Sequence, residues 1–225
     1  MKRFIPVAVI GLTALIGQWP AVAGEISPRV LISQSSSGRE RDLLTTGLTK
    51  YKKGDYQGAI ADYTKAINLN RNYSEAYNNR GNARAALNQR SGAIDDFTQA
   101  VRINSNDEYA YSNRGTVYLE DGKREQALTD FNKAIKINPS YAKAHYHRGL
   151  ANADLGNRRE AVSDFTNAIS RNSQYAKAYY QRADVKERDD DRGGAREDFE
   201  TAADLYKQQG KISSYQESLE RSRRL

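Results

Sequence analysis

Apolar residues recur at helical spacing along most of this chain. In the stretch AIDDFTQAVRIN the apolar positions fall on one face of a helix, and they are Ala93, Ile94, Phe97, Ala100, Val101 and Ile103. Acidic, amide and basic residues fill the positions between them. The same pattern returns on both sides of this stretch, and no segment predicts a strand. The sequence therefore predicts an all-α protein built from short amphipathic helices.

The helical pattern repeats every 34 residues. Small residues recur at that interval in three sets: Gly81, Gly115, Gly149 and Ala183; Ala59, Ala93, Ala127, Ala161 and Ala195; and Ala66, Ala100, Ala134, Ala168 and Ala202. An aromatic ring recurs in the same register at Tyr63, Phe97, Phe131, Phe165 and Phe199. Because small side chains let two helices approach closely, each unit is expected to be a pair of packed helices. Gly54, Gly122 and Gly156 fall between the helices of their units, where a helix end favours a residue that tolerates positive φ.

Five units agree in this register, at about 40–73, 74–107, 108–141, 142–175 and 176–209. Their pattern resembles the tetratricopeptide repeat, a helix–turn–helix unit of 34 residues. The second unit has the small and aromatic residues that this family places at fixed offsets, namely Tyr77, Gly81, Ala93, Phe97 and Ala100, and the third adds Tyr118 and Pro139. The resemblance implies an α-solenoid, in which stacked units share a core that one unit alone cannot bury.

The segments outside the five units have separate roles. Residues 210–225 place Ile212, Tyr215 and Leu219 on one face, so we expect a C-terminal capping helix. At the other end, Lys2 and Arg3 precede a short apolar run and an Ala-Val-Ala cleavage site, which predicts a cleavable signal peptide over 1–23. Residues 24–41 are Ser-rich, without a helical period, and are expected to form a flexible leader.

These features predict an exported protein with no stable membrane insertion after the signal is cleaved. The apolar run is shorter than the roughly 20 residues that a spanning helix needs. The phrasing NRG…AIxDFTxAI is similar to tetratricopeptide proteins of bacteria, particularly cyanobacteria. The resemblance implies the periplasm, or the thylakoid lumen if the source is cyanobacterial.

Composition and charge argue against several functions. The chain has no Cys, so disulfides and thiolate metal sites are excluded. Without residues 1–23, 33 basic residues face 28 acidic ones, and this mixed net charge of +5 lacks the one-sided basic stripe of a nucleic-acid-binding protein. The only histidines, His145 and His147, are two residues apart on a helix and face different ways. We therefore expect no catalytic residue, no cofactor and no metal site.

A recurrent Arg occupies a position where this family commonly has Leu. The Arg residues are Arg80, Arg114, Arg148 and Arg182, and an Asp precedes each aromatic ring at Asp62, Asp96, Asp130, Asp164 and Asp198. A partly buried Arg needs a carboxylate partner, so the sequence predicts repeated Arg–Asp pairs that join helices. Counting does not decide whether each Arg meets the Asp of its own unit or of the preceding one. Either scheme leaves one Asp over.

In the family that this chain resembles, the first helix of each unit lines a concave groove. Carried over position by position, the resemblance implies these groove residues: Asn78, Asn79, Asn82, Tyr109, Ser112, Asn113, Thr116, Lys143, Tyr146, His147, Lys177, Tyr180 and Gln181. Amides both donate and accept hydrogen bonds, which suits the backbone of an extended peptide. Asn79 and Asn113 also match the asparagine ladder found in one member of the family. The favoured function is a non-catalytic scaffold that binds a peptide segment of a protein partner and could assist assembly of envelope or photosynthetic complexes.

One alternative is the carboxylate clamp by which some family members hold the C-terminus of a chaperone. Asn82, Asn113 and Lys143 match three of its five positions. Asn78 and His147 stand where the clamp has Lys and Arg, so two of its cations are replaced.

Two further alternatives come from other classes of function. A structural protein of the envelope could self-associate end to end or through partly exposed tyrosines such as Tyr179 and Tyr206. Delivery of a small ligand or metal ion is weakly suggested by His147 and Asp184.

Overall fold

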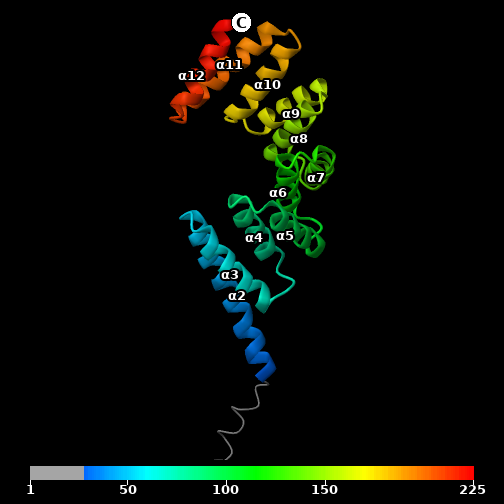
Figure 1. Ribbon diagram of the computed structural model, residues 1–225, viewed down its shortest axis with the longest axis vertical. Coiled ribbons are helices and arrows are strands. Elements are labelled where there is room, and N and C mark those ends of the chain that lie inside the picture. The colour runs from blue at the N-terminus through cyan, green and yellow to red at the C-terminus, as the bar shows by residue number, and fades with distance from the viewer. Residues whose placement is uncertain (1–27) are drawn as a thin grey trace, which may run out of the picture.

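The computed structural model describes residues 28–225, with side chains from Gly38 onward. This part of the chain consists of eleven helices without a strand (Figure 1). They are α2 (Pro28–Lys52), α3 (Tyr56–Leu69), α4 (Ser74–Ala86), α5 (Arg90–Ile103), α6 (Glu108–Glu120), α7 (Arg124–Ile137), α8 (Ala142–Asp154), α9 (Arg158–Arg171), α10 (Ala176–Arg188), α11 (Arg192–Gln208) and α12 (Ile212–Arg224). The expected signal peptide lies outside the described residues.

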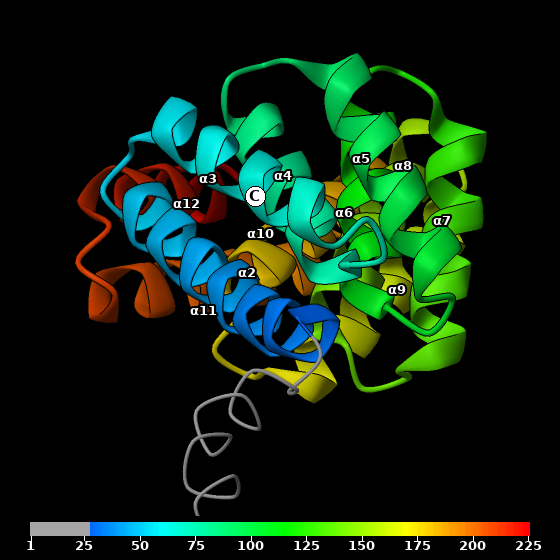
Figure 2. The ribbon, with the colours of Figure 1, turned by 90° about the horizontal axis from the view of Figure 1, so that it is seen from below.

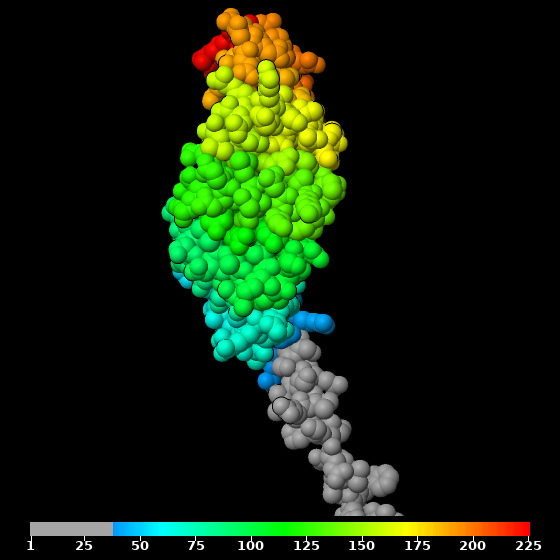
Figure 3. Space-filling model, turned by 90° about the vertical axis from the view of Figure 1, so that its right-hand side faces the viewer, coloured from blue at the N-terminus to red at the C-terminus, as the bar shows by residue number. Residues whose placement is uncertain are grey.

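The helices stack in chain order. Each helix packs most extensively against its neighbours in sequence, and the first helices of successive units also touch, α4 with α6, α6 with α8 and α8 with α10. In the space-filling view the units form successive bands from one end of the molecule to the other (Figure 3). The ribbon bends into an arc with α2 at one end and α12 at the other (Figure 1), and the view from below looks along this stack (Figure 2). The predicted all-α solenoid of helix pairs is confirmed.

The N-terminal segment differs from the flexible leader that the sequence suggested. The backbone is helical from Pro28, so α2 is 25 residues long and continues well before the first unit. Pro is well accommodated in the first turn of a helix, where its missing N–H has no intrahelical partner. Once packing fixes the part of α2 that lies against α3, each further residue adds a backbone hydrogen bond without a new nucleation step.

The turn inside each unit repeats one backbone conformation. Gly54, Gly122 and Gly156 have φ of +82°, +73° and +80°, as predicted for residues that follow a helix end. Asn88 and Asp190 take the same place in the other two units, with φ of +60° and +62°. Asn and Asp tolerate this left-handed region better than other non-glycine residues, which explains how the turn survives without glycine there.

In the first four units the core places an aromatic ring against a glycine, and in the fifth unit Phe199 lies in one cluster with Ala183. The five rings of the second helices are at most 1% exposed. A Cβ built at Gly115 would lie 2.9 Å from Cε1 of Phe131, and at Gly81 it would lie 2.7 Å from Cε1 of Phe97. These distances are too short for a methyl group, so the recurrent glycine lets the two helices of a unit approach, as the repeat predicted.

The C-terminal helix α12 packs against α11, where the first helix of a sixth unit would lie. Its Arg221 donates a hydrogen bond 3.0 Å long to Asp184 of α10, and it also contacts Glu187 and the ring of Phe199. Ser218 of α12 is fully buried. The helix therefore covers the end of the stack, in the place that was expected for a capping helix.

In the described part of the chain, none of the helices combines the length and the apolar character that a membrane span requires.

Candidate partner-binding groove

Each recurrent Arg bonds to the Asp of its own unit. Arg114 donates from Nε and Nη2 to the two carboxylate oxygens of Asp130, both at 2.8 Å. The same two-pronged contact joins Arg80 to Asp96 and Arg182 to Asp198. These aspartates are buried, so the fork geometry of Arg satisfies carboxylates that water cannot reach.

The third guanidinium nitrogen reaches the preceding unit. Arg80 donates from Nη1 to Oγ1 of Thr64 at 3.1 Å, and Arg114 donates in the same way to Thr98 at 3.0 Å. One Arg therefore joins three helices from two units. Each pair stabilises both the fold of a unit and the stacking of neighbours.

Asp62, the one recurrent Asp that this own-unit pairing leaves without an Arg, has a different partner. The first unit has no Arg at this position, and Lys50 of α2 lies 2.6 Å from the carboxylate of Asp62. Burial alone would raise the pKa of Asp62, but the hydrogen bond and charge of Lys50 hold that pKa below its ordinary value. Arg84 and Lys186 occupy the equivalent position in the second and fifth units, each 2.8 Å from the local Asp.

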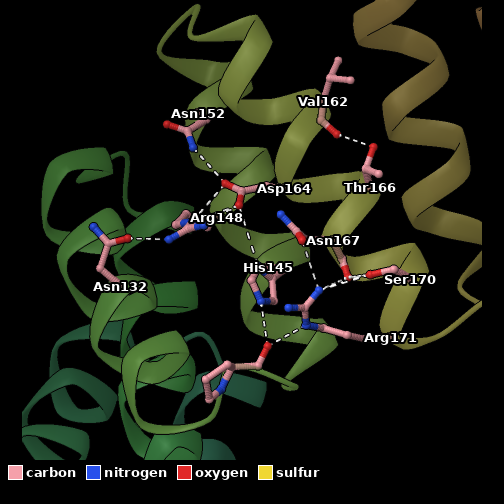
Figure 4. Close-up of polar contacts among 11 residues, drawn as sticks. Asn132, His145, Arg148, Asn152, Val162, Asp164, Thr166, Asn167, Ser170 and Arg171 are labelled. Atoms are coloured by element: carbon pink, nitrogen blue, oxygen red, sulfur yellow. Dashed lines mark hydrogen bonds and ion pairs between the residues drawn. The ribbon is translucent and has the colours of Figure 1, made fainter.

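The fourth unit keeps the same Arg–Asp pair and adds other polar neighbours to it (Figure 4). Asp164 accepts from Arg148 and from Nδ2 of Asn152, and Nδ1 of His145 lies 3.8 Å away. Burial would raise the pKa of Asp164, but the nearby imidazole of His145 and the hydrogen bonds and charge of Arg148 keep that pKa below its usual range. A hollow of about 490 Å³ borders this cluster between α7 and α9. Because the charged groups of this cluster already bond to one another, we interpret the cluster as structural.

The concave side of the solenoid contains a pocket of about 350 Å³, which we call the central pocket. It collects six of the groove residues that the sequence indicated: Asn82, Ser112, Asn113, Thr116, Lys143 and His147. They come from α4, α6 and α8, the first helices of three successive units. Phe97 and Val117 supply apolar wall, and Tyr51 and Tyr141 add rings. The pocket thus offers amide, hydroxyl and ammonium groups above an apolar floor.

His147 is the central residue of the groove. Its ring stacks on Phe131, with 5.8 Å between centroids, and meets Tyr146 edge to face at 5.1 Å. Burial, together with the charges of Lys143 and Lys177, lowers the pKa of His147 to about 4. The imidazole is therefore neutral near pH 7, and it cannot replace the Arg of a carboxylate clamp as a cation.

Asparagines link neighbouring helices along the groove. Asn113 of α6 donates from Nδ2 to Oδ1 of Asn78 on α4, at 3.1 Å. Asn78 stands where a clamp would have its first Lys, and its side-chain oxygen already accepts this hydrogen bond within the protein. The asparagine contact between these units therefore joins Asn78 and Asn113, and Asn79, which occupies the ladder position of its own unit, takes no part in this bond.

A second pocket, of about 230 Å³, follows toward the C-terminus, and we call it the tyrosine pocket. It is lined by Tyr146, Lys177, Tyr180, Gln181, Tyr206, Ser214 and Glu217. Burial raises the pKa of Tyr146 to about 12, so its hydroxyl remains a proton donor. Tyr180 donates to Oε1 of Glu217 at 2.6 Å, so α12 closes one wall of this pocket.

Ten of the thirteen groove residues from the sequence line one of these two pockets. Asn78 bonds to Asn113, Asn79 lines neither pocket, and Tyr109 is 52% exposed with its ring against Tyr141. Sequence reasoning missed the contribution of α12. Ser214 lies 34 residues after Tyr180, so continuing the repeat count into the capping helix would have identified it.

Of the two tyrosines suggested for self-association, Tyr179 is partly exposed and Tyr206 is buried. Tyr206 is only 6% exposed, and Tyr179 is partly buried beneath the guanidinium of Arg182. The large apolar side chains that are exposed among the described residues are Leu69, Tyr109 and Ile212, on three different helices. Among these residues, exposed apolar surface is therefore dispersed.

Comparisons with known proteins agree with this geometry. Family models described as TPR repeat and tetratricopeptide repeat match residues 47–88, 81–122, 116–156 and 142–175. No curated protein sequence matches this chain.

Several solved structures are similar. The crystal structure of MamA superposes with a TM-score of 0.66 and 25% identity, over 73% of this chain and 96% of that one. YrrB, described as a TPR protein with an unusual peptide-binding site, gives 0.61 and 22% identity over 77% and 91% of the two chains. The first TPR of Spaghetti (RPAP3) bound to an HSP90 peptide gives 0.52 and 27% over 53% and 95%. Since the family models together span residues 47–175, more than half of the sequence, this chain belongs to the tetratricopeptide repeat family.

Proposed function

We propose that this protein is a non-catalytic adaptor whose concave groove binds an extended segment of a partner protein. The observation that carries the proposal is the central pocket, where α4, α6 and α8 present Asn82, Asn113 and Lys143 together. Amides can pair with both the N–H and the C=O of a bound backbone, so they grip a chain with little dependence on its sequence.

The similar structures support a protein partner. YrrB is described as having a peptide-binding site, and the TPR of Spaghetti was solved with a bound HSP90 peptide. The fold by itself does not give a function, so the groups that line the pocket carry the proposal. The amide and hydroxyl groups there lie beside the partly exposed rings of Tyr51 and Tyr141, which suits a segment with mixed polar and apolar side chains.

The proposed place of action is outside the cytoplasm, in the periplasm or the thylakoid lumen. This part of the proposal rests on the sequence of residues 1–23, which has the charged start, apolar core and Ala-Val-Ala site of a cleavable signal. Assembly of an envelope or photosynthetic complex is the role we propose for such an adaptor. Fractionation of source cells, with N-terminal sequencing of the protein, should give a mature chain that begins at Gly24.

The groove is tested by site-specific photo-crosslinking in source cells. A photoreactive amino acid at Thr116, inside the central pocket, should trap a defined partner, because that side chain faces the bound segment. The same group at Lys133, an exposed position on the second helix of that unit, is the matched control.

The decisive variant keeps every lysine and removes two amides, as Asn82→Ala with Asn113→Ala. Loss of the Thr116 adduct in this variant, with unchanged circular dichroism, would support the groove. An adduct that forms equally from Lys133, or that persists in the variant, would place the partner on another surface and refute the proposal.

A further inference from the structure

One edge of the groove changes charge along the solenoid. The second position of the first helix in successive units is occupied, at intervals of 34 residues, by Glu75, Tyr109, Lys143 and Lys177. Lys211, a further 34 residues along, is the N-cap residue that directly precedes α12. The edge is acidic in the second unit, aromatic in the third and basic from the fourth unit onward. This order is not visible in the net charge of the chain.

The three lysines differ from most other repeated cations of the fold. Lys50, Arg84 and Lys186 bond to buried aspartates. Lys143, Lys177 and Lys211 are exposed, and none of them forms an ion pair with a carboxylate in the described part of the chain. Their charges are therefore available to a ligand.

These lysines border the two pockets of the groove. Lys143 lines the central pocket and Lys177 lines the tyrosine pocket. Lys211 lies 5.9 Å from the ring centre of Tyr206, which is itself part of the tyrosine pocket. His147, between them, carries the charge effects of both Lys143 and Lys177, which shows that the two ammonium groups act on the same central region.

We propose that the groove selects an acidic segment of its partner protein, with carboxylates beside Lys143, Lys177 and Lys211. This inference rests on the proposed function and specifies its ligand. The segment would lie across the first helices of the fourth and fifth units and the start of α12. Glu75 at the same position would repel a carboxylate, so the acidic part of the segment belongs at the C-terminal end of the groove.

The acids that border the pockets do not cancel this charge. Glu217 in the tyrosine pocket is a single carboxylate that accepts a hydrogen bond from Tyr180, whereas Lys177 and Lys211 bring two positive charges to the border of that pocket. Glu120 is at the C-terminal end of α6, whereas Lys143 is at the N-terminal end of α8. Since these helices occupy the same place in successive units, the two charges lie toward opposite edges of the groove.

The arrangement differs from a carboxylate clamp. A clamp gathers its cations around one terminal carboxylate, and two of its positions here hold Asn78 and the neutral His147. Lys143, Lys177 and Lys211, which we call the lysine row, instead place single charges one unit apart. Packed helices lie about 10 Å from one another. A segment in the polyproline II conformation has three residues per turn and rises about 3.1 Å per residue, so every third side chain lies on the same face about 9 Å from the last. Acidic residues at every third position of such a segment therefore match the row.

The curvature of the surface favours a peptide over a membrane. The lysines border pockets on the concave side, whereas an anionic bilayer presents an extended surface that cannot follow a narrow groove. A single chain can enter the groove and place its side chains beside each lysine.

The test uses the mature chain and two synthetic nine-residue peptides with blocked ends. One has Glu at every third position between serines, and the other has Gln in place of each Glu. By isothermal titration we expect the Glu peptide to bind at least about tenfold more tightly at low salt, with an affinity that falls as salt rises.

Two charge-matched variants locate the effect. Lys143→Gln with Lys177→Gln should weaken the Glu peptide by about tenfold, since each exposed pair contributes a few-fold. Lys133→Gln with Lys136→Gln, on exposed positions of α7, removes the same charge and should change the affinity by less than about twofold.

The imidazole of His147 gives a second readout within the groove. A carboxylate between the lysines would favour the imidazolium, so binding of the Glu peptide should raise the pKa of His147 measured by NMR. The variant His147→Gln assigns the resonance, because His145 is the only other histidine.

Three outcomes would overturn the inference. If the Gln peptide binds as tightly as the Glu peptide, the groove binds peptides without selecting acids, and the proposed function survives. If the α7 variant loses as much affinity as the lysine-row variant, the attraction is non-specific. If neither peptide binds while phosphatidylglycerol vesicles are captured and then lost in the lysine-row variant, the row recognises lipid.

Discussion

The buried pair of Arg114 and Asp130 allows the sharpest test of how the solenoid is held together. Arg114 is the residue that supplies hydrogen bonds to this carboxylate among the described residues, through two contacts of 2.8 Å. The side chain of Asp130 is only 4% exposed. Replacing Arg114 by Met keeps a long apolar stem and leaves the carboxylate buried without a cation.

The cost follows from the unpaired charge. Removing one partner of a buried ion pair typically costs about 3–5 kcal/mol, and we expect Arg114→Met to fall in that range. Arg80→Met is the matched comparison, because Asp96 keeps Arg84 at 2.8 Å. That variant should cost about 1–2 kcal/mol, the scale of lost hydrogen bonds with a charge still present.

A third variant tests whether the loss of stability comes from the unpaired charge or from the absence of the ion pair itself. Arg114→Met combined with Asp130→Leu removes both charges, and an apolar pair of similar volume is often close to neutral, so we expect its stability within about 1 kcal/mol of wild type. With Asp130→Leu alone as a fourth variant to close the double-mutant cycle, the coupling energy between the two sites should exceed about 2 kcal/mol.

Urea unfolding followed by circular dichroism measures all four variants against wild type. The slope of each transition must be compared as well, because stacked repeats can unfold in parts. If Arg114→Met costs less than about 1 kcal/mol, or no more than Arg80→Met, the carboxylate does not depend on its Arg and the reasoning fails.

Three further predictions concern packing, pH and the C-terminal helix. Gly115→Ala should destabilise the fold by about 1–3 kcal/mol, because its Cβ would press on Phe131, whereas Gly193→Ala meets nothing within 4 Å and should be neutral or slightly stabilising in the same urea titration. In the folded protein the pKa of His147 is lowered to about 4, so the unfolded chain binds more protons than the folded one between about pH 6.5 and 4. The free energy of unfolding should therefore fall by up to about 3 kcal/mol as the pH drops through that window. The variant His147→Gln should show a shallower decline, and a decline identical to wild type would refute the assignment. Arg221→Met should release α12 from the carboxylates of α10, so amide hydrogen exchange should accelerate in α12 and stay unchanged in α6; protection of α12 equal to wild type would contradict the docking role.

The sequence predicted the helices and turns well, because these depend on residues that recur within each unit of 34 residues. Helical spacing identified the two helices of each unit, and the positive φ of Gly122 was expected from its place after a helix. The prediction failed where local composition misled. The Ser-rich segment after Pro28 has no amphipathic period, yet it is helical as the extension of a helix that packing stabilises.

The groove was only partly predictable. Counting along the first helices found residues of both pockets, such as Asn113 and Lys177, because position in the unit determines which face a residue lies on. The equivalent positions were assigned only in the five units and not in α12, so Ser214 and Glu217, which complete the tyrosine pocket, were not predicted. Expected exposure was wrong for Tyr206, which neighbouring helices bury.

The sequence by itself determined the helical units, their number and the small residues that let each pair pack, since these depend on spacing within one unit. It also determined that a buried Arg would need a carboxylate. Only the tertiary structure decided that Arg114 bonds within its own unit and reaches back to Thr98. Only the tertiary structure placed His147 between two lysines, where it is neutral. These outcomes depend on how one unit is rotated against the next, and a linear register of 34 residues does not contain that angle.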